Sequence, residues 1–187
     1  MKQILSCGGQ EFKDMFAAGS SWLEKTVPDI NAINVFPVPD GDTGTNMFLT
    51  MRSVMEEADR VSEHSVSAVA KAMAQGALMG ARGNSGVILS QFFRGLAKGL
   101  DEKDSITGSD LAIALGEAAR AAYKGLSQPV EGTMLTVVKD ASKAAEEAAR
   151  NDPENLTKVA EAAVPVAWVL QGLVLAQPGV LLARLML

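Results

Sequence analysis

The segment Asn34-Val-Phe-Pro-Val-Pro-Asp-Gly-Asp-Thr-Gly-Thr-Asn46 precedes an apolar, helix-like run and is rich in residue types that build sites. Its two prolines stiffen the backbone, and its two glycines permit positive φ or a close backbone approach. Asp40 and Asp42 supply hard oxygen ligands of the kind that Mg²⁺ prefers. We expect this loop to hold a metal ion and phosphate, with a helix beginning near Thr45 or Asn46.

Two other interpretations of this loop compete with a phosphate site. In an EF-hand calcium loop, Asp40 and Asp42 would take the first and third positions, but Thr45 and Met51 would stand where glycine and glutamate belong. The loop could instead be a capped turn whose polar side chains satisfy nearby backbone donors. Two prolines, two glycines and two carboxylates so close together favour a ligand site over such a turn.

Length and composition favour one helical domain. We expect the 187 residues, numbered 1–187, to form a single domain with its own core, and a 5% aromatic share beside plentiful alanine, leucine and methionine favours helices. The net charge of −5 gives no reason to expect nucleic acid as a partner. Cys7 and His64 are each the only residue of their type, which excludes an intramolecular disulfide and a Cys/His zinc cluster. His64 lies in a polar stretch, and we expect it to be exposed.

The periodicity predicts an all-α fold, an antiparallel helical bundle or barrel of about seven to eight helices with ligand loops at one end. The first helix carries Phe12 and Leu23 and leads to the loop through Pro28 and Asn31. No segment reads as a convincing strand. The other helices are predicted from about residue 45, over 65–79, over 85–100, from an N-cap at Ser109 to 123, over 133–150, and from a cap and first-turn proline at Asp152-Pro153.

Gly-rich polar turns recur at 40–46, 80–86 and 125–133. Alternate turns of an antiparallel bundle lie at the same end, so we expect these three to meet around one anion. Gly83-Asn-Ser-Gly86 lacks the lysine and spacing of a Walker A loop, but Asn84 and Ser85 could cradle phosphate, or Ser85 could simply cap a helix. Arg82 could balance phosphate charge or lie in water.

Three segments together resemble a known family. Residues 34–47, the run Gly80-Ala-Arg-Gly-Asn-Ser-Gly-Val-Ile-Leu-Ser-Gln91, and Glu131-Gly-Thr-Met134 resemble the nucleotide-binding domain of bacterial fatty acid kinases, a branch of the dihydroxyacetone kinase L-domain (DhaL, DAK2-like) family. The likeness covers about residues 10–165. It implies an all-helical barrel that holds Mg²⁺ and ATP or ADP in the loops at one end.

The resemblance also assigns residues. It implies that Asp40 and Asp42 are metal carboxylates and catalytic residues, and that Asn34 supplies a neutral metal ligand in place of a third aspartate. Arg82, next to the second Gly-rich turn, is the third catalytic candidate, because it could balance phosphate charge. The cofactor-binding residues that it implies are Thr43, Gly44, Thr45, Asn46, Asn84, Ser85, Gly125, Thr133 and Met134.

The C-terminal part departs from the family pattern. Relatives end the domain with a turn like Asp-Ala-Gly-Gly, which this sequence lacks, so we expect residues 166–187 to be an altered or truncated end. Residues 162–183 carry no charge and superficially suit a membrane span, but Pro165, Pro178-Gly179 and two glutamines argue against it.

The activity that the resemblance implies is phosphoryl transfer from Mg-ATP to a fatty acid carboxylate presented by a DegV-like fatty-acid-binding carrier protein. Such a carboxylate is already an anion, so the lack of a candidate histidine base is no obstacle. A dihydroxyacetone-type kinase subunit, a non-catalytic nucleotide-binding or docking domain, and a plain helical scaffold remain alternatives. The short apolar run at the N-terminus does not suit a secretory signal, so a cytoplasmic location is the default expectation, and further domains or an oligomer are compatible with the sequence.

Overall fold

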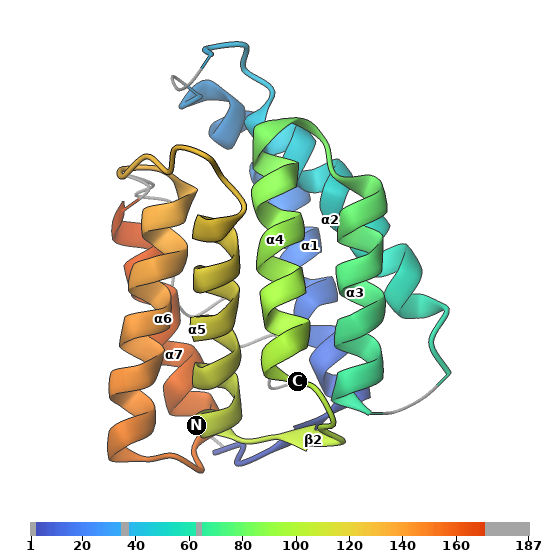
Figure 1. The fold of residues 1–187 in the computed structure, drawn as a ribbon, viewed down its shortest axis with the longest axis vertical. Coiled ribbons are helices and arrows are strands. Elements are labelled where there is room, and N and C mark those ends of the chain that lie inside the picture. The colour runs from blue at the N-terminus through green and yellow to red at the C-terminus, as the bar shows by residue number, and fades with distance from the viewer. Residues whose placement is uncertain (1–2, 35–37, 63–64, 171–187) are drawn as a thin grey trace.

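The computed structural model describes residues 3–34, 38–62 and 65–170. It confirms the predicted all-α fold, since seven helices and one very small sheet make up the described residues (Figure 1). The helices are α1 (Gly9–Ala32), α2 (Thr43–Asp59), α3 (Val66–Gly80), α4 (Gly83–Gly99), α5 (Gly108–Lys124), α6 (Met134–Asn151) and α7 (Leu156–Leu170).

Neighbours in sequence are neighbours in space. Each helix packs on the next one along the chain, and α5 also contacts α7. Successive helices run antiparallel, so the connections α1–α2, α3–α4 and α5–α6 reach the same end, at the top of Figure 1. These connections contain the three Gly-rich turns, so the predicted convergence of the turns is confirmed.

The core lies along the axis of the bundle. Phe12, Phe93, Met73 and Leu96 are almost completely buried. Phe16 links two of them, because its ring centroid lies 5.1 Å from that of Phe12 and 5.4 Å from that of Phe93. Burying a side chain of this size stabilises the fold by about 1.5–3 kcal/mol, so this aromatic contact fixes α1 against α4.

The prediction of no strand is wrong at one place. Strand β1 (Cys7–Gly8) pairs antiparallel with β2 (Ser105–Ile106), with Cys7 opposite Ile106. Ile4 adds two hydrogen bonds, because its amide donates to Thr157 Oγ1 at 3.0 Å and its carbonyl accepts from the Thr157 amide at 3.3 Å. The N-terminal segment therefore closes the end of the bundle opposite the Gly-rich turns.

Several predicted helix boundaries are corrected. Helix α1 continues through Pro28, and its last turns are packed against the start of α2. Helix α2 begins at Thr43, about two residues earlier than predicted. Helix α4 begins at Gly83, so Ser85 lies inside its first turn and is not its N-cap.

The N-caps of α5 and α7 also differ from the prediction. Thr107, not Ser109, caps α5, because the Asp110 carboxylate accepts from the Thr107 amide at 3.0 Å. Helix α7 starts at Leu156, where buried Asn155 accepts the Lys158 amide at 3.0 Å. The predicted cap and proline at Asp152-Pro153 instead form a turn before α7, in which the Pro153 carbonyl accepts the Ser109 amide at 2.7 Å.

Two predictions fall outside the described residues. These are the exposure of His64 and most of the C-terminal stretch, since the description ends at 170. Among the helices within the described residues, none combines the length and apolar character that a membrane crossing requires.

Candidate functional site

A cavity of about 680 Å³ lies at the end where the three Gly-rich turns meet. All three turns contribute to its wall, together with the helix ends that they join. Nine of the residues predicted to form the site line it: Asn34, Asp40, Asp42, Thr43, Asn46, Asn84, Ser85, Thr133 and Met134. Four others, Gly44, Thr45, Arg82 and Gly125, are not among the lining residues.

In the first turn, Asn34 holds the carboxylate of Asp40. The Asn34 side-chain amide donates to Asp40 Oδ1 at 3.3 Å and to the Val38 carbonyl at 2.6 Å. Its oxygen accepts a hydrogen bond from the Thr43 hydroxyl. Asn34 therefore orients Asp40 from inside the loop. A metal ion bound by the Asn34 side-chain oxygen would share that oxygen with the Thr43 hydroxyl.

Asn31 is a site-organising residue for which the sequence analysis proposed no role. Its side-chain oxygen accepts the amides of Gly44 at 2.8 Å and Thr45 at 3.2 Å, and its amide donates to Thr45 Oγ1 at 3.0 Å. It thus satisfies two of the free donors at the start of α2. The sequence did contain a sign of this role, because Asn31 is a polar residue near the end of α1 and lies only a short distance before the start of α2.

Gly44 permits this close contact between α1 and α2. A Cβ at Gly44 would lie 2.7 Å from the Val27 carbonyl oxygen and 3.0 Å from Asn31 Oδ1. Any larger residue would push the two helix ends apart. Gly44 therefore supports the wall of the cavity from behind, although its own amide is already bonded to Asn31.

The second turn is fixed to the first by short contacts. Gly83 has a φ of +58°, and a Cβ there would lie 2.5 Å from Asn46 Nδ2. Ser85 is buried, and its hydroxyl donates to the Thr43 carbonyl at 3.4 Å. These contacts place the start of α4 beside the start of α2, so the positive ends of two helix dipoles face one cavity.

The third turn is held by a polar cluster around Glu131. The Glu131 carboxylate accepts from Lys139 Nζ and from the Thr136 hydroxyl, both at 2.7 Å, and from the Tyr123 hydroxyl at 3.1 Å. Hydrogen bonding, first from Lys139 and then from Thr136, lowers the pKa of Glu131 to about 2. Because Tyr123 belongs to α5 and Lys139 to α6, this cluster clamps the loop between them; the sequence analysis missed it.

Apolar residues form much of the cavity lining. They are Ile30, Ile33, Val38, Met47, Ile88, Leu126, Val130, Met134, Leu135 and Val137. Gly125 does not line the cavity and packs on α4 instead, where a Cβ would lie 2.4 Å from Gln91 Cγ. A cavity of this size, lined by apolar residues together with two carboxylates and two helix N-termini, suits a ligand that has both apolar and anionic parts.

The donor set at the anionic end fits a hard divalent cation. Asp40 and Asp42 line the same cavity and provide carboxylate oxygens. In the part of the chain that the structure describes, no group of three or more His, Cys, Asp or Glu residues could hold a metal ion. Mg²⁺ needs no such group, because it usually binds one or two carboxylates and completes its shell with water and substrate phosphates.

Helical architecture, paired carboxylates and converging Gly-rich turns define a kinase-type nucleotide-binding domain. The comparison with protein families agrees: the description "DAK2 domain" matches residues 37–169, and the chain belongs to that family. Protein YloV of Bacillus subtilis is 48% identical over 142 residues, which cover 76% of this chain and 26% of YloV. An uncharacterized protein of Staphylococcus aureus is 46% identical over 148 residues, covering 79% of this chain and 27% of that protein. The chain thus spans about a quarter of the length of these curated relatives.

Proposed function

We propose that the chain is an ATP- and Mg²⁺-dependent kinase domain that phosphorylates a fatty acid carboxylate presented by a DegV-like carrier protein. The observation that supports it most is that one cavity is lined by Asp40 and Asp42, by the starts of α2 and α4, and by many apolar residues. The apolar lining suits a nucleotide base, and the carboxylates and helix starts suit Mg²⁺ and phosphates.

Asp40 and Asp42 are the residues that would hold Mg²⁺. When bound, this ion supplies charge neutralisation for the β- and γ-phosphates. Asn34 keeps Asp40 in place, and the exposed residue Asn84 at the start of α4 lines the cavity and would donate to a phosphate oxygen. The chain's part in catalysis is therefore alignment and electrostatic support.

The transfer itself needs no proton acceptor. A carboxylate oxygen of the acceptor forms a bond to the γ-phosphorus while the bond to the β-phosphate oxygen breaks, which gives an acyl phosphate and ADP. Fatty acids have pKa values of about 4–5 and are ionised at neutral pH, so no base has to remove a proton. A hydroxyl acceptor such as dihydroxyacetone would lose a proton in the same step.

The test combines binding and turnover. Calorimetric titration with ATP, with and without Mg²⁺, measures the nucleotide site, and radiolabelled γ-phosphate measures transfer to palmitate on its carrier or to dihydroxyacetone. We expect Mg²⁺-dependent binding and transfer to the fatty acid alone. Transfer to dihydroxyacetone would identify the other kinase branch, and binding without any transfer would identify a non-catalytic nucleotide-binding domain. Absence of binding would reject the nucleotide site.

A further inference from the structure

The side chains that line the cavity differ in chemistry between its turns. The first two turns and the helix starts that follow them provide both carboxylates and the amides of Asn46 and Asn84, which suit a metal ion and phosphates. The connection between α5 and α6 and the start of α6 contribute mainly apolar residues, namely Leu126, Val130, Met134, Leu135 and Val137. Among the described residues, the polar side chains that line the cavity from this side are those of Gln128 and Thr133. This side of the cavity therefore suits a nucleotide base better than the first two turns do.

Gln128 is the residue on this side whose polar side chain is still available. The Thr133 hydroxyl is already engaged, because it donates to the Val130 carbonyl at 2.8 Å and accepts the Leu135 amide at 3.3 Å. The exposed side chain of Gln128, in contrast, forms no hydrogen bond with any other residue in the described part of the chain. Its amide offers a ligand one oxygen that accepts and one NH₂ group that donates.

The backbone is anchored on both sides of Gln128. Leu126 packs against a buried cluster that includes Leu135. On the other side, Glu131 is held by hydrogen bonds to α5 and α6. Pro129 follows Gln128 directly and disfavours helical backbone angles at that residue. Gln128 is thus presented at the cavity from a short, fixed segment, so little conformational freedom would be lost when a ligand binds.

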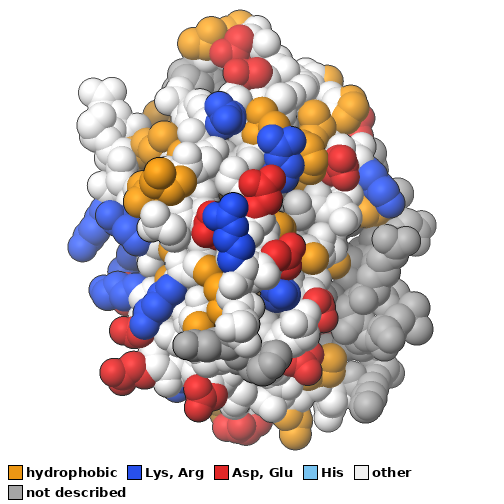
Figure 2. All heavy atoms as spheres, turned by 90° about the vertical axis from the view of Figure 1, so that its right-hand side faces the viewer, with side chains coloured by type: hydrophobic (Ala, Val, Ile, Leu, Met, Phe, Trp, Pro, Cys, Tyr) orange, Lys and Arg blue, Asp and Glu red, His pale blue; other side chains and the backbone are white. Residues whose placement is uncertain are grey.

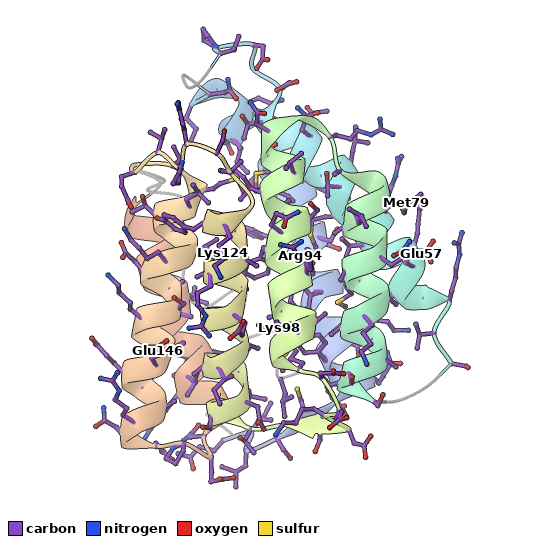
Figure 3. All side chains as sticks on the ribbon, viewed as in Figure 1. Glu57, Met79, Arg94, Lys98, Lys124 and Glu146 are labelled. Atoms are coloured by element: carbon purple, nitrogen blue, oxygen red, sulfur yellow. The ribbon has the colours of Figure 1, made fainter. Side chains whose placement is uncertain are left out.

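Lysine and arginine side chains do not compete with Gln128 inside the cavity. Among the described residues, none of the lining residues is a lysine or an arginine. In Figure 3, Arg94 and Lys98 lie on the side of α4, below the loops. Figure 2 shows hydrophobic and acidic side chains at the topmost part of the molecule, with lysine and arginine side chains below them. A neutral amide, and not a cation, is therefore the group available to distinguish one base from another.

We propose that Gln128 reads the base of the bound nucleotide and gives the site a preference for adenine over guanine. This inference rests on the proposed function, in which the apolar lining holds the base. A glutamine amide can pair with adenine at two points, because its oxygen accepts from the N6 amino group while its NH₂ group donates to N7. Guanine has acceptors at both corresponding positions, O6 and N7, so the glutamine oxygen would face a second acceptor.

The test compares the dissociation constants of Mg-ATP and Mg-GTP, measured by calorimetry. We expect the wild type to bind Mg-ATP about tenfold more tightly than Mg-GTP. Gln128→Leu should abolish this preference, and Gln128→Arg should invert it, because an arginine side chain pairs with O6 and N7 of guanine. The ratio of the two constants cancels any general effect of the added charge. Gln75→Arg, at an exposed position on α3, makes the same change of charge outside the cavity and should keep the wild-type ratio.

A modified nucleotide tests the same contact from the side of the ligand. In 7-deaza-ATP a C–H group replaces N7, so its magnesium complex should bind the wild type several-fold more weakly than Mg-ATP does. Gln128→Leu should bind the two nucleotides equally, because the partner of N7 is already absent. This coupling separates a direct contact from a merely structural effect of the substitution.

The outcomes keep the two proposals apart. Mg-ATP binding with no preference over Mg-GTP in the wild type, or with the wild-type ratio retained in Gln128→Leu, would overturn the role of Gln128 and leave the nucleotide site standing. Failure of the wild type to bind either nucleotide would reject the nucleotide site itself, and the role of Gln128 with it. Circular dichroism of each variant checks that the helical fold is intact.

Discussion

Asp40 and Asp42 differ from the other acidic residues in lining a cavity that two helix N-termini also face. If they bind the metal, replacing either carboxylate by the isosteric amide should selectively remove the contribution of Mg²⁺ to ATP binding. We expect Asp40→Asn and Asp42→Asn each to weaken Mg-ATP binding at least about tenfold, or roughly 1.4 kcal/mol, in calorimetric titration. Helicity measured by circular dichroism should not change, because neither side chain is part of the core.

The control for these variants is Asp104→Asn, an exposed carboxylate beside β2 at the opposite end of the bundle. It changes the net charge by the same amount and should leave Mg-ATP binding unaltered. If all three variants bound Mg-ATP like the wild type, Asp40 and Asp42 would not be metal ligands.

Asn31 acts on the site through the backbone of α2. Asn31→Ala leaves the amides of Gly44 and Thr45 without their acceptor, so we expect a loss of about 1–2 kcal/mol in the free energy of unfolding by urea. Asn31→Asp keeps an acceptor at the helix N-terminus and should recover most of that loss. Asn151→Ala, which removes an exposed hydrogen bond at the end of α6, is the matched control. An Asn31→Ala variant no less stable than Asn151→Ala would contradict the capping role.

At the scale of elements, the connection between α5 and α6 depends on the Glu131 cluster. Since hydrogen bonding lowers the folded-state pKa of Glu131 to about 2 from its usual value of 4.5, the cluster stabilises the loop above the unfolded pKa. That stabilisation decreases as the pH falls below about 4.5 and is lost as the pH passes through about 2. Glu131→Gln removes the charge at every pH and should therefore mimic the acidified loop.

We expect Glu131→Gln to show faster amide hydrogen exchange in residues 125–133 at neutral pH, and Mg-ATP binding several-fold weaker than the wild type. The difference in exchange between wild type and variant, corrected for intrinsic rates, should shrink between about pH 4.5 and pH 2. Glu147→Gln, at an exposed position on α6, serves as the control. A difference that stayed constant down to pH 2 would contradict the ion-pair explanation.

The elements also show which features a sequence reveals. Long amphipathic repeats predicted every helix, because a core-facing stripe spans many residues and tolerates local exceptions. The boundaries were less accurate since they depend on single contacts between distant residues, such as Ser109 with Pro153 across two helices. The β1–β2 pair was missed because two residues are too few for a period. Pro28 suggested an interruption, yet tertiary packing of α1 on α2 keeps the helix continuous.

The candidate site likewise has residues that a sequence motif reveals and residues that only a contact in the folded structure reveals. Motif residues such as Asp40, Asn84 and Met134 could be placed at one cavity because alternate turns of an antiparallel bundle share an end. Asn31 and Lys139 could not, since each lies within a helix and contributes through a contact formed only in three dimensions. The metal- and nucleotide-binding roles of the motif residues stay predictions.

The whole molecule has one closed end and one open end. At the closed end, the β1–β2 pair and the bonds between Ile4 and Thr157 tie the N-terminal segment to α5 and α7. At the open end, a hydrogen bond from Ser85 to Thr43 joins the first two turns, the Glu131 cluster holds the third, and all three line a cavity of about 680 Å³. We therefore expect the closed end to be more stable than the open end. A bound ligand should order the open end far more than the closed end.

This asymmetry predicts how Mg-ATP should affect the fold. A ligand that binds only the native state at about a hundred times its dissociation constant adds roughly 2.7 kcal/mol, which raises the melting temperature of a chain of this size by about 5–10 °C. We expect that shift in differential scanning fluorimetry with Mg-ATP, and none in an Asp40→Asn/Asp42→Asn double variant. Extra hydrogen-exchange protection should concentrate in residues 38–46, 80–86 and 125–134. Protection spread equally over β1 and β2, or an equal shift with ATP in the absence of Mg²⁺, would show that the ligand does not bind through the metal site at the open end.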